Sequence, residues 1–181
     1  MSRPQNSIMF MLIILLLLSV TLNISFSKNL KDVFTYESQC LMNVGDHNSD
    51  LSNIVDGKND NDFKNKVIYS VKEDWDNLRV FLLNCRNYSL NTNLLRKYLS
   101  TIDGTMINIS ENLGDLLIKD VNDFTTEDKD FINKYISLSK SIQDNGSELR
   151  RKINFIIPVY TKFIIKDNLN SIVNTIIKSK F

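Results

Sequence analysis

The spacing of apolar residues between positions 63 and 85 constrains the fold of this chain more than any other feature of its sequence. Intervals of 4, 4, 4, 3, 4 and 3 residues separate the members of one series, which are Phe63, Val67, Val71, Trp75, Leu78, Leu82 and Cys85. Side chains at these intervals share one face of an α-helix, because the helix turns once in about 3.6 residues. The spacing therefore predicts a long helix that buries this face.

Similar apolar series predict further helices over about 30–44, 95–117, 125–145 and 147–176. The chain has only five glycines and two prolines, which is little material for the many turns of an all-β sandwich. We therefore expect an all-α fold, an antiparallel bundle of four to five amphipathic helices.

Several residues mark where these helices should end or bend. Gly45 should end the first helix, and Asn145-Gly146 should end the helix that Thr125 or Thr126 caps. Pro158 should kink the last helix, because its ring removes a backbone donor and clashes with the preceding turn.

Two stretches leave more than one outcome open. Gly104 lies inside the helix over 95–117, so this segment is either one helix bent there or two helices with a turn at 103–105. The polar stretch at 46–62 is interpreted as a surface loop, with room for one short turn at 51–55.

The N-terminus has the features of a signal peptide. Arg3 precedes an apolar run over 8–20, and the small residues of Ser25-Phe26-Ser27 suit a cleavage site after Ser27. The alternative is a signal anchor that stays in the protein. The apolar run ends at Asn23, short of the roughly 20 residues that a membrane span needs. The sequence thus favours removal of 1–27 and a secreted, extracellular domain over 28–181, with no membrane span left.

The overall charge excludes one class of partner. The formal net charge is +1, and it falls to zero once Arg3 leaves with the signal peptide. A neutral chain has no general attraction for polyanions, so we do not expect it to bind nucleic acid.

The expected mature chain, 28–181, holds two cysteines and three sequons. We expect a disulfide between Cys40 and Cys85, because the count is even and the compartment oxidising. The alternative is two buried thiols. The sequons begin at Asn87, Asn108 and Asn145, a number that the asparagine content alone produces by chance. These asparagines are candidate glycosylation sites with no further support.

Catalytic and metal-binding patterns fail on physical grounds. His47 is the sole histidine, so no histidine-based zinc site can form. The run from Asp46 to Asp50 begins like a calcium loop, but Leu51 and Gly57 stand where that loop needs Gly and Glu. The carboxylates beside Trp75 fit a solvated helix face. We expect no cofactor, no metal and no enzymatic activity.

Charge is distributed unevenly along the chain. Residues 111–130 hold seven acids and two lysines, whereas residues 148–181 hold seven bases and two acids. The two segments either neutralise each other across the bundle or form a polar docking surface. The apolar residues of the last helix extend beyond a single stripe. Three interpretations remain open: the helix is the central one of the bundle, it binds a partner, or it lines a ligand cavity.

The layout resembles secreted helical cytokines and the secreted helical effectors of parasites and plant-feeding insects, in architecture alone. Export, the lack of catalytic and metal-binding patterns and the uneven charge together favour a secreted interaction protein that binds another protein outside the producing cell. The alternative function is a carrier of a small apolar ligand. Its cavity would be lined by Phe155, Tyr160, Phe163 and Ile164.

Overall fold

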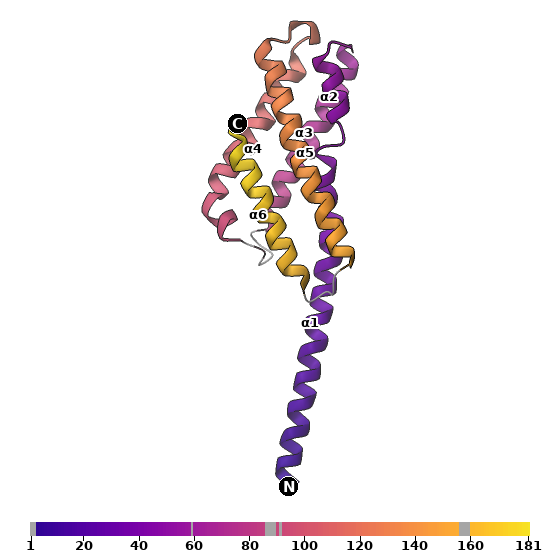
Figure 1. Ribbon diagram of the computed structural model, residues 1–181, viewed down its shortest axis with the longest axis vertical. Helices are drawn as coiled ribbons and strands as arrows, with labels where there is room; N and C mark the ends of the chain where they lie inside the picture. Colours follow the sequence, from indigo (N-terminus) through magenta and orange to yellow (C-terminus); the bar gives the residue numbers. More distant parts are fainter. Residues whose placement is uncertain (1–2, 59, 86–89, 91, 156–159) are drawn as a thin grey trace.

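A computed structural model describes residues 3–58, 60–85, 90, 92–155 and 160–181 (Figure 1). This part of the chain holds six α-helices, a 3-10 turn and no strand. Their bounds are α1 Arg3–Asn43, α2 Asn48–Val55, α3 Asn61–Cys85, α4 Asn93–Ile118, η1 Val121–Asp123, α5 Thr126–Phe155 and α6 Thr161–Ser179. The all-α prediction is confirmed.

The long helices form an antiparallel bundle (Figure 1). Helix α1 enters at one end, which we call the base, and α3, α4, α5 and α6 then run alternately away from and toward the opposite end, which we call the distal end. Helices α3 and α4, α5 and α6, and α1 and α5 lie side by side. Short connections between successive helices produce this up-and-down order.

The face predicted for the helix over 63–85 is buried in α3. Trp75 lies at its centre, where the indole Nε1 donates a hydrogen bond to the carbonyl oxygen of Met106 in α4 at 3.0 Å. Its ring meets the ring of Tyr135 in α5 edge to face, with centroids 5.6 Å apart. The Tyr135 hydroxyl in turn donates to the carbonyl oxygen of Val44 at 3.3 Å. These contacts join α3, α4, α5 and the residue that follows α1.

The polar stretch at 46–62 is more ordered than a surface loop. Helix α2 occupies 48–55 and buries Leu51 and Ile54, two residues of the single turn that the sequence allowed there. Helix α4 continues through Gly104 without a break, which excludes the alternative of two helices with a turn at 103–105.

The helix end predicted at Asn145-Gly146 is wrong, because α5 runs through it to Phe155. Gly146 is buried where α5 crosses α1. A β-carbon built there would lie 2.7 Å from Leu41 Cβ and 3.2 Å from the Leu41 carbonyl carbon. The glycine thus permits close approach of two helices and does not stop one. Pro158 and its predicted kink lie outside the described residues.

Gly146→Ala should destabilise the protein by about 2 kcal/mol, because the new methyl group overlaps atoms that cannot move without shifting α1. Gly104→Ala is the matched control, since a β-carbon added at Gly104 would have no atom within 4 Å. It should stabilise α4 by about 1 kcal/mol. Urea unfolding followed by circular dichroism measures both. Equal effects of the two substitutions would contradict the close approach.

Helix α1 extends far beyond the bundle (Figure 1). Residues Ile8–Phe26 form an apolar helical stretch of 19 residues, long and apolar enough to cross a membrane, and none of it is buried. Phe34 and Leu41, farther along the same helix, are fully buried in the bundle. The N-terminal stretch is compatible with a signal sequence and equally with a membrane anchor.

Candidate functional site

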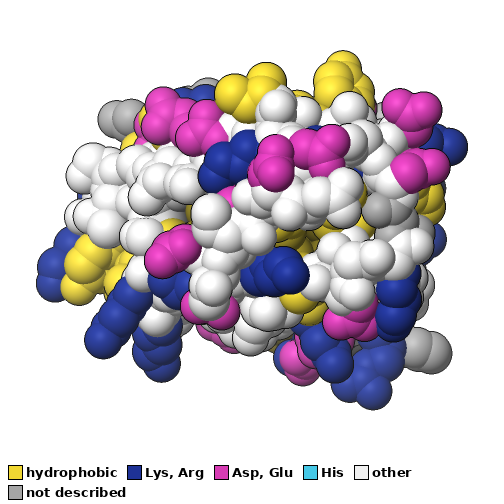
Figure 2. Space-filling model, turned by 90° about the horizontal axis from the view of Figure 1, so that it is seen from above, with side chains coloured by type: hydrophobic (Ala, Val, Ile, Leu, Met, Phe, Trp, Pro, Cys, Tyr) yellow, Lys and Arg dark blue, Asp and Glu magenta, His cyan; other side chains and the backbone are white. Residues whose placement is uncertain are grey.

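The candidate functional site is the distal end of the bundle. It is built from the start of α3, the end of α4, η1 and the start of α5, which the antiparallel topology brings together. Seen from above, acidic and basic side chains lie among polar ones, and apolar side chains form small separate patches (Figure 2).

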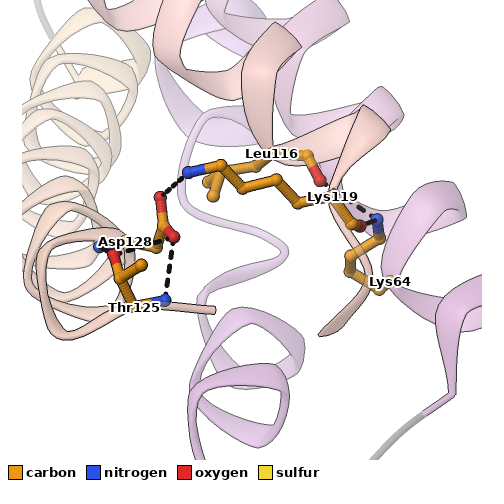
Figure 3. A network of polar contacts seen from close by, with 5 residues as sticks. All are labelled: Lys64, Leu116, Lys119, Thr125 and Asp128. Atoms are coloured by element: carbon orange, nitrogen blue, oxygen red, sulfur yellow. Dashed lines mark hydrogen bonds and ion pairs between the residues drawn. The ribbon is translucent and has the colours of Figure 1, made fainter. Parts of the chain in front are cut away.

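Lys64 anchors the site from beneath. Its side chain is almost fully buried, and its Nζ donates to the carbonyl oxygens of Leu116 at 3.0 Å, Leu117 at 3.1 Å and Lys119 (Figure 3). These are carbonyls at the C-terminal end of α4, which carries no basic residue in its last turn. Lys64 therefore supplies from α3 the cation that a helix C-terminus favours.

Two opposing effects act on the charge of Lys64. Burial lowers the pKa of the ammonium group, and the nearby carboxylate of Asp120 raises it. The ring of Phe124 lies 5.9 Å from Nζ and covers one side of the group. The three carbonyl acceptors account for the position of the buried cation.

Asn61, at the start of α3, holds the turn that follows α4. Its side-chain oxygen accepts a hydrogen bond from the backbone amide of Val121 at 2.8 Å, and its Nδ2 donates to the carboxylate of Asp120. Asp120 also accepts the Asn122 amide at 2.9 Å. Hydrogen bonds from Asn122 and Asn61 lower the pKa of the Asp120 carboxyl, so it is ionised at neutral pH.

A second network fixes the start of α5. The Thr125 amide donates to Asp128 Oδ2 at 2.9 Å, and the Asp128 amide donates to Thr125 Oγ1 at 3.2 Å. This reciprocal pair is a capping box, which confirms the predicted helix start. Lys119 adds an ion pair to Asp128 at 2.6 Å (Figure 3). Burial opposes ionisation of Asp128, but the bonds from Lys119 and Thr125 outweigh it and lower its pKa.

Ile118, the last residue of α4, projects from this network. Its side chain is 86% exposed, although the neighbouring Leu116 is buried. Exposed acidic residues lie near it in the sequence, on α4, η1 and the start of α5. They are Glu111, Asp115, Asp123, Glu127 and Asp130. The distal end thus presents the exposed Ile118 side chain on a hydrogen-bonded platform where these acids outnumber the exposed bases Lys119 and Lys129.

The predicted disulfide is not supported, because Cys40 and Cys85 are not bonded to each other. Phe34 of α1 packs against Phe81 of α3, with ring centroids 6.0 Å apart. The two helices run in opposite directions from this contact. Cys40 is six residues to the distal side and Cys85 four residues to the basal side, about 15 Å apart along the axes. A disulfide requires Cα atoms within about 7 Å.

Of the candidate glycosylation sites, Asn87 lies outside the described residues and Asn108 is exposed on α4. Asn145 is not in a turn, as predicted, but half-buried within α5. Its Nδ2 donates to the Ser141 carbonyl oxygen at 2.7 Å, and its own carbonyl oxygen accepts from Asn168 at 2.7 Å. A glycan on Asn145 would have to fit at this half-buried position within α5.

The residues expected to line a ligand cavity do not converge on the interior. Tyr160 and Phe163 are 59% and 66% exposed, and Ile164 is partly buried against the core. Phe155 ends α5, and its side chain lies outside the described part of the structure. The exposure of both aromatic rings gives no support to a carrier of apolar ligands at this place.

The residues weighed for metal binding and catalysis lie at the surface. His47 contacts Asp50 at 3.5 Å at the start of α2. Asp76 pairs with Lys72 at 2.8 Å, and burial raises the pKa of the neighbouring Asp74 carboxyl. Within the described ranges, no group of three His, Cys, Asp or Glu side chains could hold a metal ion.

The two charged segments of the sequence lie at different places. The acidic segment over 111–130 forms much of the distal end, whereas Arg151, Lys152, Lys162 and Lys166 lie toward the base. Among the ion pairs of the described residues, none joins 111–130 to 148–181. Five of the seven bases of 148–181 are therefore separated from the acidic segment along the long axis, whereas Lys178 and Lys180 lie at the C-terminal end of α6, away from the base.

Comparison with known proteins finds no family model, no curated protein and no solved structure that matches this chain.

Proposed function

We propose that the chain is an exported, non-catalytic helical protein that binds another protein through its distal end. The observation that carries the proposal is Ile118, an 86% exposed side chain held on an acidic platform of fixed geometry. An apolar anchor surrounded by charged groups is a common arrangement of the residues that dominate a protein interface.

The platform favours a partner with a basic surface around an apolar pocket. Acidic groups would attract such a surface and raise the association rate at low salt. Lys64, Asn61 and the Thr125–Asp128 pair hold the platform in one conformation, so binding would order few groups. A preorganised surface loses less entropy on association.

Export supports a partner outside the producing cell. The apolar N-terminal helix directs the chain to the membrane, and cleavage after Ser27 would release the bundle as a secreted protein. Retention of α1 would instead hold the bundle at a membrane surface. The distal end would then face away from the membrane, because α1 enters the bundle at the base.

The test begins with a photo-crosslinking residue at position 118 of the full chain, applied to intact cells and tissues that the protein can reach. The captured protein is purified, and its dissociation constant is then measured directly. Ile118→Ser should weaken binding at least tenfold, about 1.4 kcal/mol. Asp123→Lys with Glu127→Lys should weaken it further and reduce its dependence on salt.

Val80→Ser is the matched control. Val80 is also an exposed aliphatic side chain, 54% exposed on α3, and its loss should leave the dissociation constant unchanged. Equal binding by the Ile118→Ser and Val80→Ser variants would reject the distal end as the binding surface.

A further inference from the structure

The apolar stretch of α1 is better suited to a membrane than its sequence alone indicates. By sequence alone, the apolar run ends at Asn23. In the structure, Asn23 Nδ2 donates to the Ser19 carbonyl oxygen at 2.9 Å, and Thr21 Oγ1 donates to the Leu17 carbonyl oxygen at 2.8 Å. Polar side chains bonded to their own helix leave fewer groups unsatisfied in hydrocarbon. Asn23 therefore does not end the span.

The length of the stretch matches a bilayer. Ile8–Phe26 is one uninterrupted helical segment of 19 residues without a charged side chain. At about 1.5 Å per residue it is about 28 Å long, close to the roughly 30 Å of a hydrocarbon core. The helix then continues into the bundle without a break, so the bundle stands directly on this segment.

Two aromatic side chains are exposed at the base, where this segment leaves the bundle. Tyr160 immediately precedes α6 and Phe163 lies in its first turn, and both are more than half exposed. Helix α6 contacts α1, and its N-terminal end lies beside α1 at the base (Figure 1). Aromatic rings at the ends of membrane segments favour the headgroup region.

The base also carries an excess of basic groups. Among the side chains that the structure describes on α1 from Lys28 onward, the end of α5 and the start of α6, the exposed or half-buried charged ones are Lys28, Lys31, Asp32, Glu148, Arg150, Arg151, Lys152, Lys162, Lys166 and Asp167. Seven of these are basic and three acidic, and Glu148 pairs with Lys152 at 2.7 Å. Basic residues beside a membrane segment attract anionic lipid headgroups by roughly 1 kcal/mol each.

We propose that α1 is retained as a membrane anchor and that the base of the bundle rests on an anionic bilayer surface, with Tyr160 and Phe163 among the headgroups. Lys162 and Lys166 lie on the same helix as Phe163 and would contact the lipid phosphates. This arrangement turns the acidic distal end away from the membrane. The proposal rests on the base and on α1, and it is independent of partner binding through Ile118.

The first test follows the N-terminus. The full chain is expressed in cells, and its intact mass and extraction by alkaline carbonate are determined. Retention predicts a protein that keeps residues 1–27 and stays with the membranes after extraction. A soluble protein in the medium that begins at Lys28 would overturn the proposal and support the cleavage that the sequence predicts.

The second test measures contact of the base with lipid. The full chain is reconstituted in phosphatidylcholine vesicles containing phosphatidylserine, with or without bromine on the upper acyl chain. The indole introduced by Phe163→Trp should lose fluorescence in the brominated vesicles and shift to shorter wavelength. Trp75 is buried inside the bundle and adds an unquenched background.

Tyr69→Trp is the matched control, because Tyr69 is 64% exposed on α3 in the distal half of the bundle. Its indole should not be quenched. Lys162→Glu together with Lys166→Glu should reduce the quenching of the indole at position 163 in vesicles with phosphatidylserine. Equal quenching at positions 163 and 69, or none at either, would overturn contact between the base and the bilayer.

Discussion

Trp75→Ala should lower the free energy of unfolding by about 4 kcal/mol, within the range for removing a large aromatic side chain from a core. Trp75 is fully buried, packs edge to face on Tyr135 and donates to the carbonyl oxygen of Met106 at 3.0 Å. Alanine would leave a cavity between three helices and remove that hydrogen bond. A domain of this size is stable by only about 5–15 kcal/mol, so the variant should unfold at much lower urea concentration.

The measurement uses circular dichroism, because Trp75 is the chain's single tryptophan and its loss removes the fluorescence signal. Trp75→Phe keeps most of the apolar volume and should cost less than Trp75→Ala. Tyr69→Ala is the matched control on the same helix, where an exposed ring is lost, and should change stability by at most about 0.5 kcal/mol. An effect of Trp75→Ala no larger than that of Tyr69→Ala would contradict the buried position of Trp75.

The fold class and the clearest helix could be predicted from the sequence because both depend on local periodicity. The buried face of α3 follows the 3.6-residue repeat, and only Phe63 at its start remains partly exposed. The start of α5 could also be predicted, since the capping pair Thr125 and Asp128 are three residues apart. Signals of this kind lie within one segment of the chain.

Features that depend on two segments could not be predicted. Gly146 looks like a helix stop in sequence, and only the approach of Leu41 from α1 shows why glycine is needed there. The pairing of Cys40 with Cys85 failed for the same reason. The spacing within each helix placed both cysteines on an inner side, but it carries no information on the register between helices.

Only part of the candidate site could be predicted from the sequence. The net negative charge over 111–130 was visible as composition, whereas the exposure of Ile118 and the role of Lys64 were not. Lys64 follows Phe63 in an amphipathic series, where a lysine normally faces solvent. Lys119, which follows α4, is the cation that the sequence offers for its last carbonyls, but its ammonium group pairs with Asp128 instead.

The separation of charge along the long axis links the two proposals. A basic, aromatic base held at anionic lipid would leave the acidic end as the part most accessible to a partner. Its rigidity would then decide how well Ile118 is presented, and this rigidity depends on Lys64 more than on any exposed ion pair, since surface pairs contribute little.

Lys64→Met should lower the free energy of unfolding by about 3 kcal/mol, because methionine keeps the apolar stem but leaves the carbonyl oxygens of Leu116 and Leu117 without their buried donor. The loss should be greatest at the distal end. Hydrogen exchange of the amides over 116–128 should accelerate more than that of the amides around Trp75. Where a binding partner is identified through Ile118, the variant should also bind it more weakly.

Lys66→Met is the matched control, because it removes the same charge from an exposed position two residues along α3. It should change stability by at most about 0.5 kcal/mol. The comparison measures whether the carbonyls compensate for the burial of an ammonium group, since desolvation alone favours the apolar side chain. A Lys64→Met variant as stable as Lys66→Met would mean that the three hydrogen bonds only offset the desolvation of the ammonium group. Lys64 would then not be the group that holds the distal end rigid.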